Sequence, residues 1–523
     1  MKPLTGAHAS GHDSRAIGLL AGVIAALYFG SFNHDFSVNA LRYADDVERG
    51  IELFHPNHLL PNLIFRGIYL GAQALGLSDV RAIWVMQSLT VLCGIVAALA
   101  IARVAWARPR SSAGWIIGLL YALAFSAWNF AEEPDVYILP AAAVTVSLAL
   151  LLPRAHLSWR TVAALAGLAV FAVLTLQQYV FWYPVLIALV ARRDLGAARR
   201  GKLLLLAAGI PLACLIAYLV VGWVTGQLHS AHDLIAWFFG YAWSSERGFG
   251  TYRTAPSLGA RLLGSVLGLG NLVFAYEIVL SRIALSLALV SAGLLAWLGY
   301  TAVRQLFRDT PMLRGDAMLV LIWCVLNLAF ATWWESRNIE FLFPVWVGGC
   351  VLLALAAPGL DRTLLMMTAA LIGCVNWVVA FGPQHELPAR YVTAAQLAVH
   401  ERLAAGDVLI TEELNTVSYL HYFHRTDVQF LPGAVSAAMQ AAQSVPQARA
   451  ALDQALSSGA RVYTTELDEH GRLRALAEWV APLGRSGFDG AIDRDLELFY
   501  RGLDLSDQPV AGVRRVRAPA QGP

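Results

Sequence analysis

Long apolar stretches separated by short polar turns dominate the first 382 positions of the chain. Each stretch carries few charges, and most are about as long as a helix needs to be to cross the hydrocarbon layer of a bilayer. The pattern therefore predicts a mainly α-helical membrane bundle with eleven spans, at residues 16–32, 82–102, 114–130, 136–152, 162–176, 180–190, 203–224, 283–303, 317–334, 341–356 and 363–381.

Composition agrees with this prediction. Of the 523 residues, 58% are hydrophobic and only 14% charged, with a mean hydropathy of +0.57. A soluble protein has about 25% charged residues, so an ordinary soluble enzyme and a disordered protein are excluded. The five cysteines lie inside apolar runs and form no CxxC pair, so we expect neither a disulfide framework nor a zinc–thiolate site. A net charge of +2 gives no support for nucleic-acid binding.

The basic residues predict the orientation, because Arg and Lys accumulate in short cytoplasmic loops. We place the basic turns inside, which puts the N-terminus in the cytoplasm and everything after residue 382 outside a cell (inner or plasma) membrane. The transmembrane part is then 1–382, with outer loops 33–81 and 226–261. The basic turns contain Arg103, Arg108, Arg110, Arg154, Arg160, Arg192, Arg193, Arg199, Arg200, Lys202, Arg304, Arg308, Arg314 and Arg362.

Two apolar segments fit this topology poorly as spans. Residues 262–280 contain Gly264, Gly268, Gly270, Asn271 and Glu277. A carboxylate at the centre of a span costs roughly 2.5–3.5 kcal/mol. We expect a re-entrant or interfacial segment there, with a twelfth span as the alternative. Residues 59–76 carry Asn62, Arg66 and Gln73 and favour an amphipathic helix on the outer surface.

The last part of the chain has a different composition. From residue 383 to 523 there are 13 Arg and 17 Asp or Glu, and no nucleotide-binding motif occurs. Short β-like runs at 408–411, 428–431 and 461–464 alternate with helical patterns at 416–423 and 447–457, and 496–500 adds a fourth candidate strand. This alternation predicts a small extracytoplasmic α/β domain with a mainly parallel sheet, frayed after residue 508.

Carboxylates gather in three turns that the topology places on the outer face. Asp45 and Asp46 follow the first span, Glu132–Asp135 joins the third and fourth, and Glu335–Glu340 joins the ninth and tenth. Any one turn alone is typical of a solvated loop. Together, at the membrane border, they indicate a cavity with carboxylates for general-base chemistry or for a divalent cation held by Asp46, Glu133 and Asp135.

Histidines, aromatic residues and arginines of the outer loops are further candidates. His55 and His58, like His229 and His232, would share a face if helical and could then hold zinc, although an interfacial role is the simpler interpretation. The aromatic run 237–243 is typical of an interfacial belt, or of a platform for a sugar or polyprenyl chain. Forked hydrogen bonds to a lipid phosphate are the predicted role of Arg247, Arg253 and Arg337, although Arg337 could equally pair with Glu335 or Glu340.

Four of these motifs resemble those of the GT-C superfamily of membrane glycosyltransferases, in particular the protein O-mannosyltransferase and aminoarabinose-transferase-like branch. Asp45-Asp46 resembles its acidic pair after the first span, and His55-Pro56-Asn57-His58-Leu59-Leu60 resembles its HPPL-like motif. Glu133-Pro134-Asp135-Val136-Tyr137 resembles its acidic turn ending in Tyr, and Arg337 with Pro344 resembles its RY…P motif. Asn57, Asp135 and Asn338 depart from the residues common at these positions.

The resemblance implies transfer of a sugar from a polyprenyl-phosphate donor to a glycan, lipid or protein acceptor at the outer leaflet. It implies Asp45 as general base, Asp46 as its orienting partner or a cation ligand, Glu133 near the acceptor and Arg337 on the phosphate. We add further substrate contacts at Arg247, Arg253, His55, His58, Tyr137 and Glu340.

Two other classes of function stay open. A secondary transporter would bind ions at carboxylates near the middle of the membrane, whereas the acidic residues here lie at one border and no inverted repeat is evident. A non-catalytic membrane scaffold would instead use the C-terminal part to bind partners.

Overall fold

The computed structural model describes residues 11–34, 36–108, 113–193, 195–230, 232–235, 237, 257–308, 310–385, 401–411, 414–424, 428–432, 444–465, 499, 503 and 514–518. These residues are mainly helical. The chain divides into two compact units, one of residues 1–33 and 43–385 and one of residues 34–42 and 386–523.

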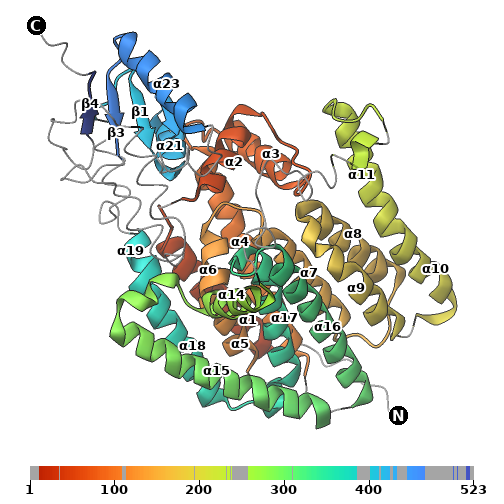
Figure 1. The fold of residues 1–523 in the computed structure, drawn as a ribbon. Coiled ribbons are helices and arrows are strands. Elements are labelled where there is room, and N and C mark those ends of the chain that lie inside the picture. Colours follow the sequence, from red (N-terminus) through yellow and green to blue (C-terminus); the bar gives the residue numbers. More distant parts are fainter. Residues whose placement is uncertain are drawn as a thin grey trace, which may run out of the picture. The chain divides into compact units, whose positions relative to one another are not determined.

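The first unit is built around α4 (Ala82–Trp106), which packs against α1 (Gly11–Gly30), α5 (Gly114–Leu123), α6 (Phe125–Glu132) and α7 (Ile138–Leu151) (Figure 1). Its contact faces are made of small residues. A Cβ on Gly94 would lie 2.8 Å from the Cβ of Ala131, and one on Gly118 would lie 2.9 Å from the carbonyl oxygen of Ala98. Small side chains let helix backbones approach closely in membrane proteins, where packing rather than exclusion of water holds helices together.

The predicted span at 114–130 is a broken helix. Ala124 has extended backbone angles (φ −67°, ψ 142°), and α5 and α6 meet there at 69°. The side chain of Asn376 donates hydrogen bonds to the carbonyl oxygens of Leu123 (3.0 Å) and Val273 (2.8 Å). A polar group from another helix thus satisfies backbone that the break exposes, which is the condition for irregular structure in a membrane bundle.

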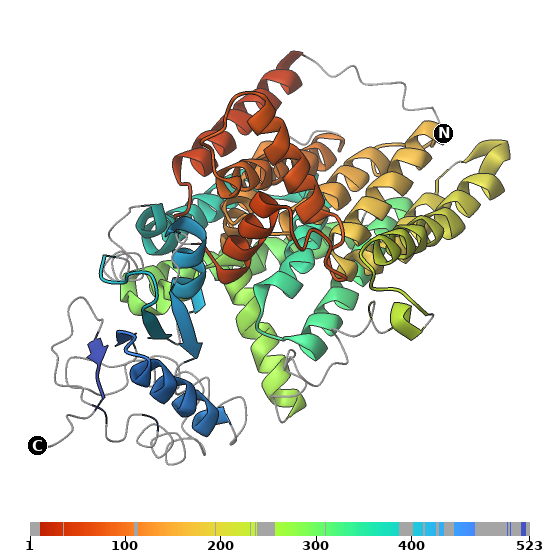
Figure 2. The same cartoon turned by 90° about the horizontal axis from the view of Figure 1, so that it is seen from above.

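A second group of helices lies beside this core (Figure 2), with α8 packed on both α11 and α7. The long helix 196–224 contains a π-helical turn just before Pro211, which has no N–H to donate to the carbonyl of Ala207. Tyr183 Oη donates to that carbonyl instead. The elements of this group are α8 (Trp159–Thr175), η1 (Gln177–Phe181), α9 (Trp182–Ala191), η2 (Gly196–Ala198), α10 (Arg199–Leu204), η3 (Leu205–Gly209) and α11 (Ile210–Val224).

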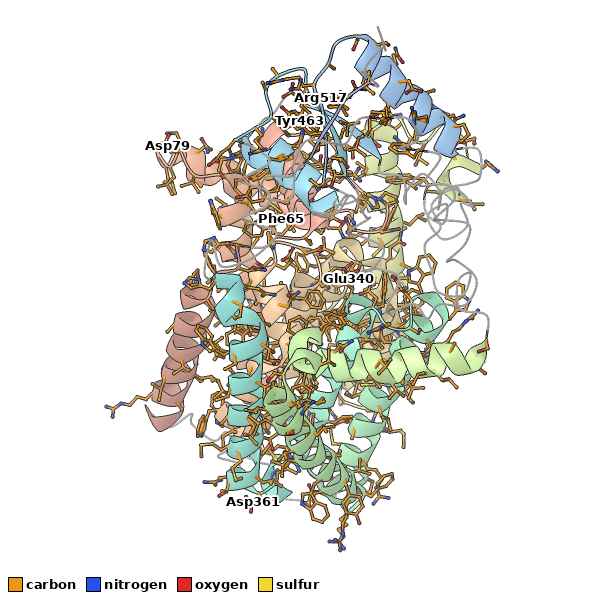
Figure 3. The ribbon with its side chains drawn as sticks, turned by 60° about the vertical axis from the view of Figure 1, so that its left-hand side comes forward. Phe65, Asp79, Glu340, Asp361, Tyr463 and Arg517 are labelled. Carbon is orange, nitrogen blue, oxygen red and sulfur yellow. The ribbon has the colours of Figure 1, made fainter. Side chains whose placement is uncertain are left out.

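The last third of the unit contains three long helices, with α17 packed between α16 and α15. Figure 3 shows α14 lying across the direction of α18, and α14 has only 16 residues. The elements are α14 (Leu258–Val273), η4 (Tyr276–Leu280), α15 (Arg282–Arg308), α16 (Pro311–Trp334), α17 (Ile339–Ala356), η5 (Ala357–Gly359), α18 (Arg362–Asn376), η6 (Trp377–Phe381) and α19 (Gly382–His385).

A helix occupies each of the eleven predicted ranges, but the number of spans stays a prediction. Among the described residues, six helices are long and apolar enough to cross a membrane, or seven if the bent pair α5–α6 is one span. The helices at 15–30, 138–151, 159–175 and 177–191 are apolar but shorter. The helix α14 is also among these shorter ones, so its length favours the re-entrant or interfacial interpretation over a twelfth span.

The second unit contains a four-stranded sheet in the order β2-β1-β3-β4, of β1 (Val408–Thr411), β2 (Gln429–Pro432), β3 (Val462–Thr464) and β4 (Arg514–Val516). The strands β2, β1 and β3 are parallel, and β4 is antiparallel to β3. Its helices are α21 (Leu414–Tyr419), η7 (Leu420–His424) and α23 (Ser444–Ser457). An ion pair between the exposed Arg461 and the buried Asp407, at 2.8 Å, fixes the start of the sheet.

Three strands of the second unit lie where the sequence predicted them, within one residue at each end. The fourth candidate, 496–500, lies outside the described residues apart from Phe499, which is helical and fully buried. The fourth observed strand is instead β4, within the stretch that we expected to be frayed. Its three residues are too few to give a local signal, and pairing with β3 defines them.

Candidate active site

The helix α2 (Val38–Arg49) carries Asp45 and Asp46 and is held at its C-terminal end by two arginines. Arg66 of α3 (Pro61–Ala74) donates to the carbonyl oxygens of Val47 (2.8 Å) and Glu48 (3.0 Å). Arg81 forms an ion pair with Glu48, its Nε donating to both carboxylate oxygens at 2.9 and 3.0 Å. Cations at a helix C-terminus satisfy its last carbonyls and favour its dipole, so both contacts fix the position of the acidic pair.

Both carboxylates are buried, with Asp45 8% and Asp46 7% exposed. Asp45 forms an ion pair with Arg49 Nε at 3.0 Å, one helical turn further along. The guanidinium of Arg49 thus supplies a compensating charge for a base at this position. A nearby cation favours the ionised form of a carboxylate, which is the form that can accept a proton.

The HPNH turn precedes α3 and is not helical. His55 and His58 form an isolated antiparallel bridge, and their rings stack with centroids 4.3 Å apart. A helical zinc pair is therefore wrong for these two histidines. His58 Nε2 lies 3.0 Å from Tyr43 Oη of α2 in a hydrogen bond, which connects the turn to the helix of the acidic pair.

Residues from distant helices hold the HPNH turn in place. Gln177 donates from its side chain to Pro56 O (2.8 Å) and from its backbone to Asn57 O (3.0 Å). Tyr218 Oη donates to the same Pro56 oxygen at 2.8 Å. These contacts come from η1 and α11, more than 100 residues away, and make the turn a rigid part of the fold.

The first residue of the second acidic turn, Glu132, serves to join helices. Its side chain is fully buried and accepts hydrogen bonds from Ser31 and from Trp128 Nε1. Gln87 of α4 donates to the carbonyl oxygens of Glu132 (2.8 Å) and Asn33 (3.0 Å). The carboxylate of the next residue, Glu133, accepts from Asn33 Nδ2 at 3.5 Å. The end of the first helix is thereby tied to the acidic turn, as expected for two segments of one site.

The second and third acidic turns meet at Glu340. Tyr137 Oη donates to Glu340 Oε2 at 2.6 Å, across 203 positions of sequence. Asn338 donates to both Glu335 and Glu340 at 3.1 Å, and its Oδ1 caps the first turn of α17. Glu340 lies far from Asp361, at opposite ends of α17 and its following turn (Figure 3). We predicted that these two turns lie close together, and the hydrogen bonds of Tyr137 and Asn338 show how they are joined.

Burial raises the pKa of Asp135 well above its ordinary value, and the charges of Glu340 and Glu133 raise it further. The backbone N–H of Val136 donates to Asp135 and opposes this shift. Tyr43 lies close enough to Tyr137 for the two phenol groups to interact electrostatically. A buried carboxyl beside like charges favours its protonated form, so Asp135 is suited to donate a hydrogen bond.

Arg337 is exposed and, among the described residues, makes no ion pair with Glu335 or Glu340. The alternative that it pairs with one of them is therefore wrong. The helix α14 presses a glycine face on this turn, since a Cβ on Gly268 would lie 3.1 Å from the carbonyl oxygens of Ser336 and Arg337. A guanidinium left open to an approaching ligand is what phosphate binding requires.

Several predicted residues fall elsewhere. Arg247 and Arg253, with the aromatic residues at 238–243, lie outside the described residues. Trp237 packs edge-on against Tyr218, with ring centroids 5.7 Å apart. His229 and His232 are exposed, in a turn where Asp233 accepts from the backbone N–H of His229.

In the part of the chain that the structure describes, no three His, Cys, Asp or Glu side chains are grouped so as to hold a metal. The metal role of Asp46, Glu133 and Asp135 therefore stays a prediction, and no step below depends on it. Tyr43 and Asn33 were not predicted as site residues. Tyr43 precedes Asp46 by three positions and so shares its helix face, and Asn33 opens a polar turn directly after the first apolar run, which are the signals that could have found them.

Comparison with known proteins is informative at the level of the fold. No protein-family model and no curated protein matches the chain. Among solved structures, ArnT from Cupriavidus metallidurans bound to undecaprenyl phosphate is similar over 99% of this chain and 100% of its own, with a TM-score of 0.59 and 14% identity. The apo state of that protein gives a TM-score of 0.54.

Two further structures are similar. The oligosaccharyltransferase AglB from Archaeoglobus fulgidus, in complex with an inhibitory peptide and a dolichol-phosphate, has a TM-score of 0.52 and 13% identity over 94% of this chain and 72% of its own. The mycobacterial arabinofuranosyltransferase AftD has a TM-score of 0.51 and 15% identity over 97% of this chain, which spans only 40% of its length. All three are GT-C glycosyltransferases, so the chain has the GT-C fold.

Proposed function

We propose that this protein is a membrane glycosyltransferase that moves a sugar from a polyprenyl-phosphate donor to an acceptor at the outer face of the membrane. The observation that carries the proposal is the Tyr137–Glu340 hydrogen bond of 2.6 Å, which joins two acidic turns on a GT-C fold. The lipid phosphates named in the ArnT and AglB structures support the choice of carrier.

Asp45 acts as the general base. Its ion pair with Arg49 favours the ionised carboxylate, and its 8% exposure leaves an edge accessible to an acceptor hydroxyl. The proton moves to Asp45 as the hydroxyl oxygen attacks the anomeric carbon, and the bond from that carbon to the carrier phosphate breaks. Asp46, on the helix face of Tyr43, orients the acceptor side of the site.

The other site residues hold substrate. Arg337 neutralises the leaving phosphate, since its guanidinium is exposed beside the Glu335–Glu340 turn. Glu133 and Glu340 accept hydrogen bonds from sugar or acceptor hydroxyls, and Tyr137 fixes Glu340. His55 and His58 line the site through Tyr43. Arg247 and Arg253 are proposed as further phosphate ligands from the sequence alone.

The decisive experiment compares Asp45→Asn with wild type in transfer from a purified polyprenyl-phosphate sugar pool, with donor binding measured in the same detergent. Loss of a general base costs about 10²–10⁴-fold in rate, whereas donor binding should change little because the apolar contacts are untouched. Asp79→Asn is the matched control, because Asp79 lies in the same loop, 33–81, is exposed, and accepts a hydrogen bond from the neighbouring Ser78.

Near-normal turnover in Asp45→Asn would remove Asp45 as the base and transfer the role to Asp46, which the same assay on Asp46→Asn then tests. Transfer that is absent from the wild type as well, with donor bound, would favour the scaffold alternative.

A further inference from the structure

An apolar groove lies away from the acidic turns, between α15, α16 and α17. Its volume is about 280 Å³. The residues that line it are apolar except for Arg314. We propose that this groove binds an acyl chain of an anionic phospholipid, with the lipid phosphate at Arg314.

The groove exists because two of its helices lack side chains at facing positions. A Cβ added to Gly299 of α15, or to Gly349 of α17, would meet no atom within 4 Å. Leu321 and Trp346 complete the walls. An unfilled void forfeits dispersion contacts on all of its surfaces. In a bundle surrounded by lipid, a hydrocarbon chain is the molecule at hand to restore those contacts.

The charge at the mouth of the groove selects the head group. Arg314 donates to the carbonyl oxygen of Phe307 at 2.7 Å, which holds its guanidinium at the C-terminal end of α15. Arg304 and Arg308 are exposed on the last turns of the same helix. In the described part of the chain none of the three has an ion pair. Basic pockets between membrane helices bind anionic lipid head groups, whereas a zwitterionic lipid offers no net charge to match.

This groove is separate from the proposed active site, so the inference does not rest on the proposed function. Arg314 and Glu335 lie at opposite ends of α16, 21 residues apart, which at 1.5 Å per residue is about 30 Å. The groove is lined by the second half of α17, toward the end marked by Asp361 in Figure 3, whereas Glu340 opens that helix. By the basic turns, this end belongs to the cytoplasmic leaflet.

The test is native mass spectrometry of the purified, delipidated full chain, titrated with phosphatidylglycerol or phosphatidylcholine of identical acyl chains. The wild type should retain phosphatidylglycerol about fivefold more strongly than phosphatidylcholine, because the charge of Arg314 attracts the anionic head group. Arg314→Gln should lose that preference and keep weak binding of both lipids. Gly349→Leu should lose both lipids, because the added side chain fills the groove.

Two controls match these variants. Gly293→Leu adds the same side chain to α15 at a position that is also open but outside the groove, and Arg160→Gln removes an exposed arginine from the first turn of α8. Both should bind as the wild type does. If Gly349→Leu fails to fold, Gly299→Leu fills the groove from the other helix.

Equal retention of phosphatidylglycerol by Gly349→Leu and Gly293→Leu would overturn the proposal. So would equal affinity of the wild type for the two phospholipids. Displacement of phosphatidylglycerol by an equimolar amount of undecaprenyl phosphate would also overturn it, because the groove would then be a site for the carrier lipid.

Discussion

Two clusters of buried charge lie at opposite ends of α16, and they are built differently. At the N-terminal end, Asp316 pairs with Arg193 at 2.8 Å and with Arg192 at 3.4 Å. The nearby Lys202 donates to the carbonyl oxygens of Leu157 and Leu195, at 2.7 and 2.9 Å. Every charge there has an oppositely charged or hydrogen-bonding partner.

At the other end, Asp135 and Glu340 are close enough for the charge of one to raise the pKa of the other. Among the described residues, neither of them has an ion pair with a cation. A buried charge without compensation costs free energy, and such groups gather at functional sites. Burial alone therefore does not mark a site: the buried Asp316 is neutralised by arginines, whereas Asp135 and Glu340 lie near each other and have no ion pair with a cation of the described residues.

We expect the two ends of α16 to face opposite sides of the membrane. Labelling of single introduced cysteines tests this orientation. Ser78→Cys and Ser457→Cys should react with an impermeant maleimide in intact cells, and Ser158→Cys, in a basic turn, only after permeabilisation. Labelling of each variant is compared with that of the wild type and scored as present or absent. Labelling of Ser158→Cys in intact cells would reverse the orientation and every site assignment with it.

Breaking the cluster around Asp316, in which each charge has a partner, should have the largest effect on stability. Arg193 is fully buried, so Arg193→Met leaves Asp316 with only the half-exposed Arg192 and should cost about 3–5 kcal/mol. Thermal unfolding in detergent measures this. Arg192→Met is the control and should cost less than about 1 kcal/mol. The double variant Arg193→Met/Asp316→Leu should recover most of the loss; no recovery would show that Arg193 acts by packing rather than by charge.

At the other end of α16, removing a charge from the pair Asp135 and Glu340 should not lower the stability. Glu340→Gln removes a charge and keeps an oxygen that can accept from Tyr137, so it should leave stability unchanged or raise it by about 0.5–2 kcal/mol. The same variant should lower sugar transfer. A stability loss comparable to that of Arg193→Met would make Glu340 a structural residue and contradict the comparison.

The smallest effect expected is a dependence of stability on pH. Because the pKa of Asp135 is raised in the folded protein, folding favours its protonated form. The stabilisation is complete below the pKa of the unfolded chain, about 4, and is lost as the pH rises through the higher folded value. Melting temperatures measured between about pH 4 and pH 8 should therefore fall less steeply in Asp135→Asn than in wild type. Parallel curves would mean that Asp135 is ionised in the folded state.

Hydropathy and run length determined the helices. Apolar runs specify α4 and α17 wherever the rest of the chain lies, because a helix satisfies its own backbone hydrogen bonds. A run of four apolar or β-branched residues likewise marked β1, all of whose residues are buried, although its backbone hydrogen bonds come from β2 and β3. The three acidic turns were also found from sequence, since charges are rare in so apolar a chain and stand out at the membrane border.

Contacts between distant residues decided what the sequence could not. The break at Ala124 depends on a hydrogen bond from Asn376. The stacked geometry of His55 and His58 depends on contacts of their turn with Tyr43 and Gln177. The strand β4 is defined by its pairing with β3. The periodicity of the sequence predicts which face of an element is apolar. It does not predict which polar group of another element will contact that face, because this contact forms only when the helices pack together.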